Sequence, residues 1–214
     1  MTMTTPYAAV NFATADFPTS DIRNIGWRQA EAVVMNRLWN GEPAPDTRHA
    51  VARLLWSEAS LYIRFDCRQK EPLFLNDDPQ TIEKTMKLWE HDVCEVFLAP
   101  DASNPKRYAE FEIAPTGEWL DLLVDWTKEE PRDWEYLSEM ESFALIEPEK
   151  VTMVMRIPWK AFGGKPKAGD TWFGNLFRQV GSGDTRGYVT WSPTMTDEPQ
   201  FHVPEKFGEF AFRK

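Results

Sequence analysis

The sequence contains little of what marks several common classes of protein. Of its 214 residues only 2 are cysteine and 3 are histidine, and none stands at the spacing of a zinc or HExxH site. It has no glycine-rich phosphate loop and no serine-hydrolase motif. No apolar run reaches the roughly 18 residues of a membrane-spanning helix. Nucleotide binding, serine hydrolysis and membrane insertion therefore lack support.

Positive charge is also scarce. Lys and Arg together number 24 against 34 Asp and Glu, which gives a formal net charge of −10. Nucleic acids and anionic membranes attract basic surfaces, so we expect neither as a partner, whereas a neutral sugar is compatible with an acidic protein. The first residues lack the basic start and apolar core of a secretory signal. We expect a cytoplasmic protein, or a secreted or periplasmic one if a signal peptide has been removed.

The two cysteines, Cys67 and Cys94, both fall in predicted strands and could be neighbours. Cysteine often serves as a small core residue. We therefore favour buried free thiols over a disulfide.

Aromatic residues, by contrast, are abundant at 14% of the chain, with 10 Trp and 14 Phe. Aromatic side chains favour strands and fill cores. Short strands separated by Gly, Pro, Asn and Asp turns, without a long amphipathic helix, predict an all-β fold. We expect one antiparallel β-sandwich domain, jelly-roll-like, over residues 27–214, preceded by an extended arm over residues 1–26.

The predicted strands alternate with polar segments. A long polar loop with one helical turn near 81–86 is expected over 69–87, a solvated loop over 125–138, and a helical turn over 158–162. The strands are expected at 31–36, 49–56, 61–67, 93–98, 107–114, 118–124, 143–146, 151–157, 171–180, 188–191 and 207–212.

The stretch 88–98 carries the most information about function. Trp89 precedes a strand in which Val93, Glu95 and Phe97 point to one face, because side chains alternate along a strand. A carboxylate among apolar neighbours costs free energy unless a partner compensates it. Glu95 is therefore a candidate functional residue.

Several acidic residues could instead serve catalysis. A glycoside hydrolase needs two carboxylates about 5–10 Å apart, and Glu95, Glu110 and Glu112 could supply such a pair. Because an acidic β-protein offers many such pairs, this enzyme remains the alternative. A structural calcium ion held by Asp and backbone oxygens also stays open, although the sequence does not locate one.

A sugar-binding site combines an aromatic ring, which stacks on the C–H face of the sugar, with polar groups for its hydroxyls. Trp89 beside the acidic strand fits that chemistry, and Asn175, Arg178 and Gln179 are candidate polar partners. The alternative is that Trp89 is a core residue at one end of the sandwich.

Three stretches together carry a family resemblance. They are 54–63, the WExDxxEVF stretch that runs from Trp89 to Phe97, and 191–208 with its FHxPxxFG sequence from Phe201. Over about residues 27–213 the chain resembles the family 9 carbohydrate-binding modules and their wider relatives.

That resemblance implies a β-sandwich that grips the end of a glycan between two aromatic side chains. By position, Trp89 matches the first aromatic residue, Phe201 the second, and Glu95 the carboxylate that binds sugar hydroxyls. The family tryptophan is a phenylalanine at Phe201, and a family arginine falls near Glu112, where the charge is reversed. The resemblance also matches a strand-borne asparagine to Asn175, and a neighbouring amide position to Phe177 or Arg178.

Distant relatives with this sandwich bind a b-type haem, and Met153 and Met155 could act as ligands there, although methionines at strand spacing are more often core residues. We therefore predict a non-catalytic protein, without a required cofactor, that binds a mono- or oligosaccharide. Its predicted binding residues are Trp89, Glu95, Glu112, Asn175, Arg178 and Phe201.

Overall fold

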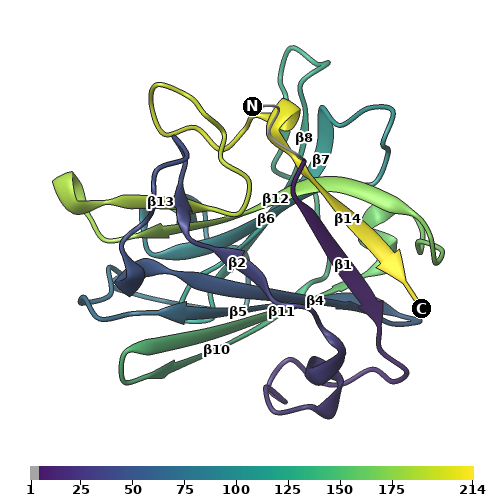
Figure 1. Ribbon diagram of the computed structural model, residues 1–214, viewed down its shortest axis with the longest axis horizontal. Helices are drawn as coiled ribbons and strands as arrows, with labels where there is room; N and C mark the ends of the chain where they lie inside the picture. The colour runs from purple at the N-terminus through teal and green to yellow at the C-terminus, as the bar shows by residue number, and fades with distance from the viewer. Residues whose placement is uncertain (1–4) are drawn as a thin grey trace.

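The computed structural model describes residues 5–214, and these form a β-sandwich built from one strongly curled sheet of 14 strands (Figure 1). The sheet order is β10-β11-β5-β4-β1-β14-β12-β6-β7-β8-β9, with β2, β3 and β13 attached beside it. The strands are β1 (Tyr7–Phe12), β2 (Val33–Met35), β3 (Arg37–Leu38), β4 (Ala50–Trp56), β5 (Ser60–Arg68), β6 (Val93–Ala99), β7 (Arg107–Ile113), β8 (Trp119–Asp125), β9 (Arg132–Asp133), β10 (Glu141–Glu147), β11 (Lys150–Pro158), β12 (Thr171–Val180), β13 (Gly187–Thr190) and β14 (Gly208–Arg213).

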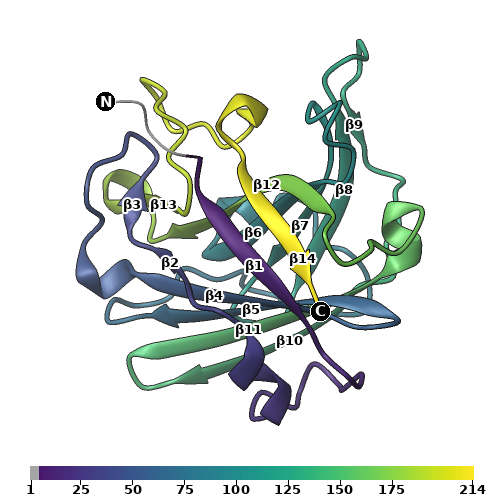
Figure 2. The same ribbon diagram turned by 45° about the vertical axis from the view of Figure 1, so that its right-hand side comes forward.

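Two layers face each other. One contains β10, β11, β5 and β4, the other contains β12, β6, β7 and β8, and β1 and β14 run diagonally between them (Figures 1 and 2). The predicted sandwich is confirmed, and its sheet is mixed, because β1 pairs in parallel with both β14 and β4.

The N-terminal segment differs from the extended arm that the sequence predicts. Residues 1–4 of that arm lie outside the described residues, and Tyr7–Phe12 form β1 inside the sheet. Ala8 and Val10 are buried in the main core. Burial of these apolar side chains stabilises β1, which pairs with β14 on one edge and with β4 on the other. This segment therefore closes the sheet.

The connections between strands contain only short 3-10 helices, and in the described residues none is long and apolar enough to cross a membrane. The turn expected near 81–86 lies instead at Leu88–Glu90, and β9 interrupts the loop expected over 125–138. The turn at 158–162 is confirmed. The 3-10 helices are η1 (Ile25–Gln29), η2 (Asp46–Arg48), η3 (Leu88–Glu90), η4 (Trp159–Phe162), η5 (Gly183–Thr185) and η6 (Pro204–Lys206).

Strand β6 is buried on both of its faces. Cys94, Val96 and Leu98 point into the main core between the layers. Val93 and Phe97 point to the other face, where they pack in a second apolar cluster with residues such as Phe177. Glu95 lies on that second face, so the alternation predicted for β6 places a carboxylate among apolar side chains.

The two cysteines lie side by side across the layers. Cys67 on β5 and Cys94 on β6 have their sulfur atoms 3.5 Å apart, and both are free and buried. The preference for buried thiols over a disulfide is confirmed.

Gly174 tests how tightly β12 packs against β6. A Cβ atom at Gly174 would lie 2.0 Å from the backbone oxygen of Phe97 and 2.8 Å from the Phe210 ring. Because the backbone oxygen cannot move aside, Gly174→Ala should lower the free energy of unfolding by about 3 kcal/mol in urea denaturation.

Gly164→Ala is the matched control, since a Cβ there meets nothing within 4 Å. Its unfolding free energy should stay within about 0.5 kcal/mol of wild type. Equal urea midpoints for the two variants would contradict the packing described at Gly174.

Candidate functional site

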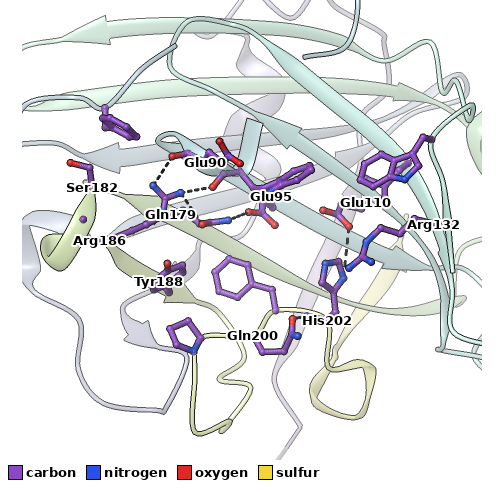
Figure 3. A pocket seen from close by; sticks show the side chains of 17 residues that line it. Glu90, Glu95, Glu110, Arg132, Gln179, Ser182, Arg186, Tyr188, Gln200 and His202 are labelled. Carbon is purple, nitrogen blue, oxygen red and sulfur yellow. Dashed lines mark hydrogen bonds and ion pairs between the residues drawn. The ribbon is translucent and has the colours of Figure 1, made fainter. Parts of the chain in front are cut away.

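A cavity of about 690 Å³ opens on the second face of β6 (Figure 3). Strands β6, β7, β8 and β12 form its base, and segments from outside these strands form its rim. The base contributes Glu95, Glu110, Leu122 and Gln179, and the rim includes Trp89, Arg132, Trp134, Arg186, Tyr188, Phe201 and His202.

Aromatic rings form much of the wall. Trp89 and Trp134 are both half-buried, with ring centroids 5.9 Å apart and planes inclined by 32°. Phe201 is stacked on the core residue Phe177 at 4.0 Å, and Tyr188 approaches Phe201 edge-on. One face of the Phe201 ring is therefore occupied by the core, while the Trp89 ring keeps part of its surface open.

Arg186 holds the turn that carries Trp89. Its guanidinium donates to the backbone oxygens of Trp89, Glu90 and His91, and also to Gln179 Oε1 at 2.9 Å. Gln179 in turn donates to Oε1 of Glu95 at 2.5 Å (Figure 3). This chain of hydrogen bonds fixes the aromatic turn relative to the strand carboxylate.

Three carboxylates lie together at the base of the cavity, and we call Glu95, Glu110 and Glu112 the carboxylate cluster. Glu95 and Glu112 are directly opposite in the β6–β7 ladder, and Glu110 is two residues along the same face of β7. Carboxylate oxygens of the three lie within 4.8 Å of one another. All three residues are buried, and Glu112 is 0% exposed. Such oxygens are the ligands that hard cations prefer.

Burial determines the protonation of the cluster. It raises the pKa of Glu95 from 4.5 to about 7, and the hydrogen bond from Gln179 acts in the opposite direction. Burial together with the charge of Glu95 raises the pKa of Glu110 to about 8. The same two causes hold the pKa of Glu112 well above its ordinary value. Near neutral pH the cluster therefore retains protons.

His202 is a neutral member of the wall. Burial lowers its pKa from 6.5 to about 4, with a smaller effect of Arg132. Trp126 donates to the Tyr108 hydroxyl at 3.1 Å, and that hydroxyl is hydrogen-bonded to Nδ1 of His202 at 2.7 Å. The 3.9 Å approach of Nδ1 to Glu110 is thus not an ion pair at neutral pH.

The structure brings Trp89, Glu95 and Phe201 to one cavity, as their predicted shared role requires. Glu112, the third member of the carboxylate cluster, does not border this cavity and is out of reach of solvent. Gln179, which the sequence offered as a polar partner, also borders the cavity.

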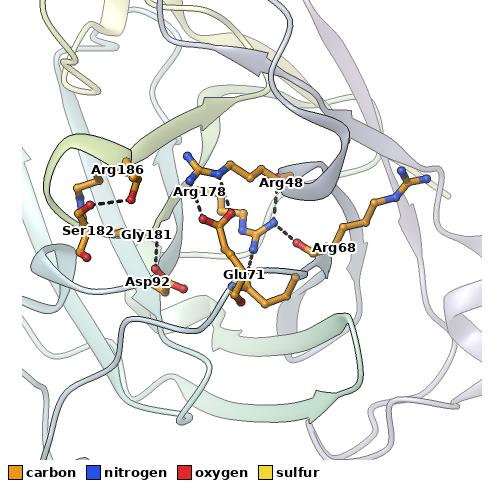
Figure 4. Close-up of polar contacts among 10 residues, drawn as sticks. Arg48, Arg68, Glu71, Asp92, Arg178, Gly181, Ser182 and Arg186 are labelled. Carbon is orange, nitrogen blue, oxygen red and sulfur yellow. Dashed lines mark hydrogen bonds and ion pairs between the residues drawn. The ribbon is translucent and has the colours of Figure 1, made fainter.

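Asn175 and Arg178 do not border the cavity. Asn175 donates to Ser192 O at 2.7 Å and accepts from the Ser192 amide at 3.0 Å, so its side chain holds a loop. Arg178 points to the other face of β12, where it donates to Arg48 O at 2.9 Å and to Arg68 O at 2.8 Å (Figure 4). Both side chains are buried and engaged with the backbone.

The sequence did not predict several other residues that line the cavity. Trp134 and Arg132 come from the segment predicted as a solvated loop, where the tryptophan was the available signal. His202 also lies in the cavity wall, although no sequence motif marks it. Met153 and Met155 are buried in the main core between the layers.

A comparison with known protein families gives a match over most of the chain. The family model described as "Carbohydrate family 9 binding domain-like" matches residues 23–214. No curated protein matches the chain.

Solved structures share the fold at low sequence identity. A Bacteroides uniformis ATCC 8492 protein, provisionally named a carbohydrate-binding protein, has a TM-score of 0.77 and 18% identity over 98% of this chain and 100% of that one. A family 9 carbohydrate-binding module from Caldicellulosiruptor kristjanssonii in complex with cellotriose has a TM-score of 0.65 and 14% identity, over 97% of this chain and 94% of that one. Its complex with glucose gives the same score and identity, over 97% and 96%.

The carboxylate cluster predicts how stability changes with pH. Glu95 and Glu110 titrate near 4.5 when unfolded but at about 7 and about 8 when folded, so the folded state binds more protons in between. The free energy of unfolding should therefore fall as pH rises through this window. Urea midpoints measured between pH 6.5 and about pH 8 avoid the opposite contribution of His202, which lies below 6.5.

Glu110→Gln should flatten this dependence, because one of the buried titrating groups is gone. The exposed Glu205→Gln serves as the control and should keep the wild-type slope. A wild-type midpoint that rises with pH over the window would contradict protonation of the cluster.

Proposed function

The chain belongs to the carbohydrate family 9 binding domain-like family, and we propose that it is a non-catalytic protein that binds a mono- or oligosaccharide in the cavity bordered by Trp89 and Phe201. One observation carries the proposal. A partly open tryptophan, a second aromatic ring and a strand carboxylate border the same cavity. The alternative that Trp89 only caps the core loses support, since its ring is half-buried at the cavity wall.

The aromatic wall supplies the stacking surface. The C–H face of a pyranose ring packs on an aromatic side chain, and Trp89 offers the open surface for it. Trp134 lies beside Trp89 at a ring inclination of 32° and extends the wall toward a second sugar unit. A volume of about 690 Å³ falls within the range of small-molecule sites.

The polar base supplies hydrogen bonds to hydroxyls. Gln179 occupies Oε1 of Glu95, which leaves Oε2 for a ligand. The amide and carboxyl group thus hold each other in one orientation before a sugar arrives, so less ordering is needed on binding. Arg186 fixes the same pair through its hydrogen bond to Gln179 Oε1.

The similar structures suggest the first ligands to try. The Caldicellulosiruptor kristjanssonii module was solved with glucose and with cellotriose. Glucose and cello-oligosaccharides are therefore the reference probes for this chain.

Trp89→Ala should remove most of the affinity for these sugars. Loss of the stacking face costs about 1–3 kcal/mol, which corresponds to roughly 5- to 150-fold in Kd, in isothermal titration calorimetry with cellotriose and glucose. Trp119→Ala is the matched control, because Trp119 is also half-buried but packs against the main core from the opposite face of β8. Unchanged affinity in Trp89→Ala would contradict the proposal.

An assay for glycoside hydrolysis tests the alternative that the protein is an enzyme. A hydrolase built from Glu95 and Glu110 would release the aryl group from nitrophenyl glycosides, and this turnover would vanish in Glu95→Gln. Such turnover would contradict the proposal that the protein is non-catalytic. Binding without turnover supports it.

A further inference from the structure

We propose that the preferred ligand is a sugar with a free ammonium group, a 2-amino-hexose or an oligomer of it, with its ammonium at the carboxylate cluster. This inference rests on the proposed sugar binding and names the class of sugar. Its basis is an excess of hydrogen-bond acceptors over cationic donors at the base of the cavity.

No protein cation neutralises the cluster. In residues 5–214, no Lys or Arg side chain makes a salt bridge with Glu95, Glu110 or Glu112. Ionised carboxylates that are buried without a cationic partner cost free energy, so the free cluster retains protons near neutral pH. The cluster therefore favours a ligand that brings the missing positive charge.

Several oxygens of the cluster also lack hydrogen bonds. Both oxygens of Glu112 and Oε2 of Glu110 are buried without a partner among the described residues. Glu112 is 0% exposed, and its carboxylate points into the cluster behind the cavity. A proton held between Glu110 and Glu112 supplies one donor to this pair. The carboxyl groups of Glu95 and Glu110 border the cavity, where a further donor can arrive with the ligand.

An ammonium group fits this arrangement. It carries three donors and no acceptor, and charge-assisted bonds of about 2.8 Å let one nitrogen reach oxygens within 4.8 Å of one another. A neutral hydroxyl has one donor and brings no charge to Glu95 and Glu110, the two carboxylates that border the cavity.

The aromatic wall favours an amino sugar over a bare metal ion. Calcium takes about six to eight oxygen ligands, and the three carboxylates occupy only the base of a cavity of about 690 Å³. An amino sugar uses the cluster through its ammonium and the Trp89 and Trp134 wall through its ring. Ring faces also attract cations.

Other charged groups near the cavity weaken the negative electrostatic potential of the carboxylate cluster without cancelling it. Arg186 faces Glu95 but is held by backbone oxygens and by Gln179. Arg132 lies 5.5 Å from the centroid of the Trp126 ring, and its charge acts to lower the pKa of Glu110. Glu90 is exposed at the rim, and His202 is neutral near pH 7.

Protons should leave the cluster when the ammonium binds. The free cluster holds protons near neutral pH, because burial raises the pKa of its members. A cationic ligand favours the ionised form and displaces them. Affinity for the amino sugar should rise with pH until the ammonium itself loses its proton, whereas affinity for glucose should change little.

Calorimetry with three related sugars tests the inference. Near neutral pH, glucosamine should bind roughly 10- to 100-fold more tightly than glucose, as expected for charge-assisted hydrogen bonds. N-acetylglucosamine is the matched neutral probe and should lack this gain. Titrations in buffers of different ionisation enthalpy should show proton release with glucosamine only.

Glu112→Gln isolates the charge, because Glu112 does not border the cavity and the substitution keeps its shape. The ratio of glucosamine to glucose affinity should fall severalfold. Wild-type proton release tests the same idea without relying on the variant's folding.

The outcomes separate the two proposals. Glucose binding without a glucosamine preference overturns the amino-sugar inference and leaves sugar binding intact. Failure of every sugar overturns both. Tight calcium binding that is lost in Glu112→Gln, with no glucosamine preference, would assign the cluster to a metal ion instead.

Discussion

Burial of β6 on both faces is the constraint on which the rest of the structure depends. One face closes the main core between the layers through Cys94, Val96 and Leu98. The other face carries Phe97 into the second apolar cluster and Glu95 into the cavity. Because a strand with two buried faces is rigid, the carboxylate that it carries has a fixed position. The same burial deprives that carboxylate of water, and this loss of hydration accounts for its raised pKa.

Two arginines near this region hold different segments of the chain in place. Arg178, on the inner face of β12, fastens the backbone at Arg48 and Arg68 (Figure 4). Arg186, beyond the end of β12, fastens the turn of Trp89 and the amide of Gln179. Both guanidinium groups donate to carbonyl oxygens and keep their charge, and the charge of Arg186 acts to lower the pKa of Glu95 without forming an ion pair with it. The cavity keeps its acidic base although arginines are close by.

Strand alternation made much of the fold and part of the site predictable. The residue patterns of 93–98 and 171–180 predicted strands that the structure contains. Trp89, Glu95 and Phe201, which were predicted to share a site, border one cavity. The same alternation separates neighbours: Gln179 faces the cavity and Arg178 does not, because adjacent residues of β12 point to opposite faces. The pairing of Glu95 with Glu112 depends on the register between β6 and β7, and the contribution of Trp134 depends on how β9 folds back. Those contacts are tertiary, so no local pattern contains them. The strand β1 escaped notice because its short, alanine-rich sequence shows little period.

The thiol pair that spans the layers gives the molecule a built-in reporter. Cys67 and Cys94 belong to different layers, and each is at most 1% exposed. An alkylating reagent can reach either sulfur only when the sandwich opens locally, so the rate of labelling in the native state measures how often the layers part. A ligand that holds the second face of β6 in place would slow that labelling at a site on the opposite face of the same strand.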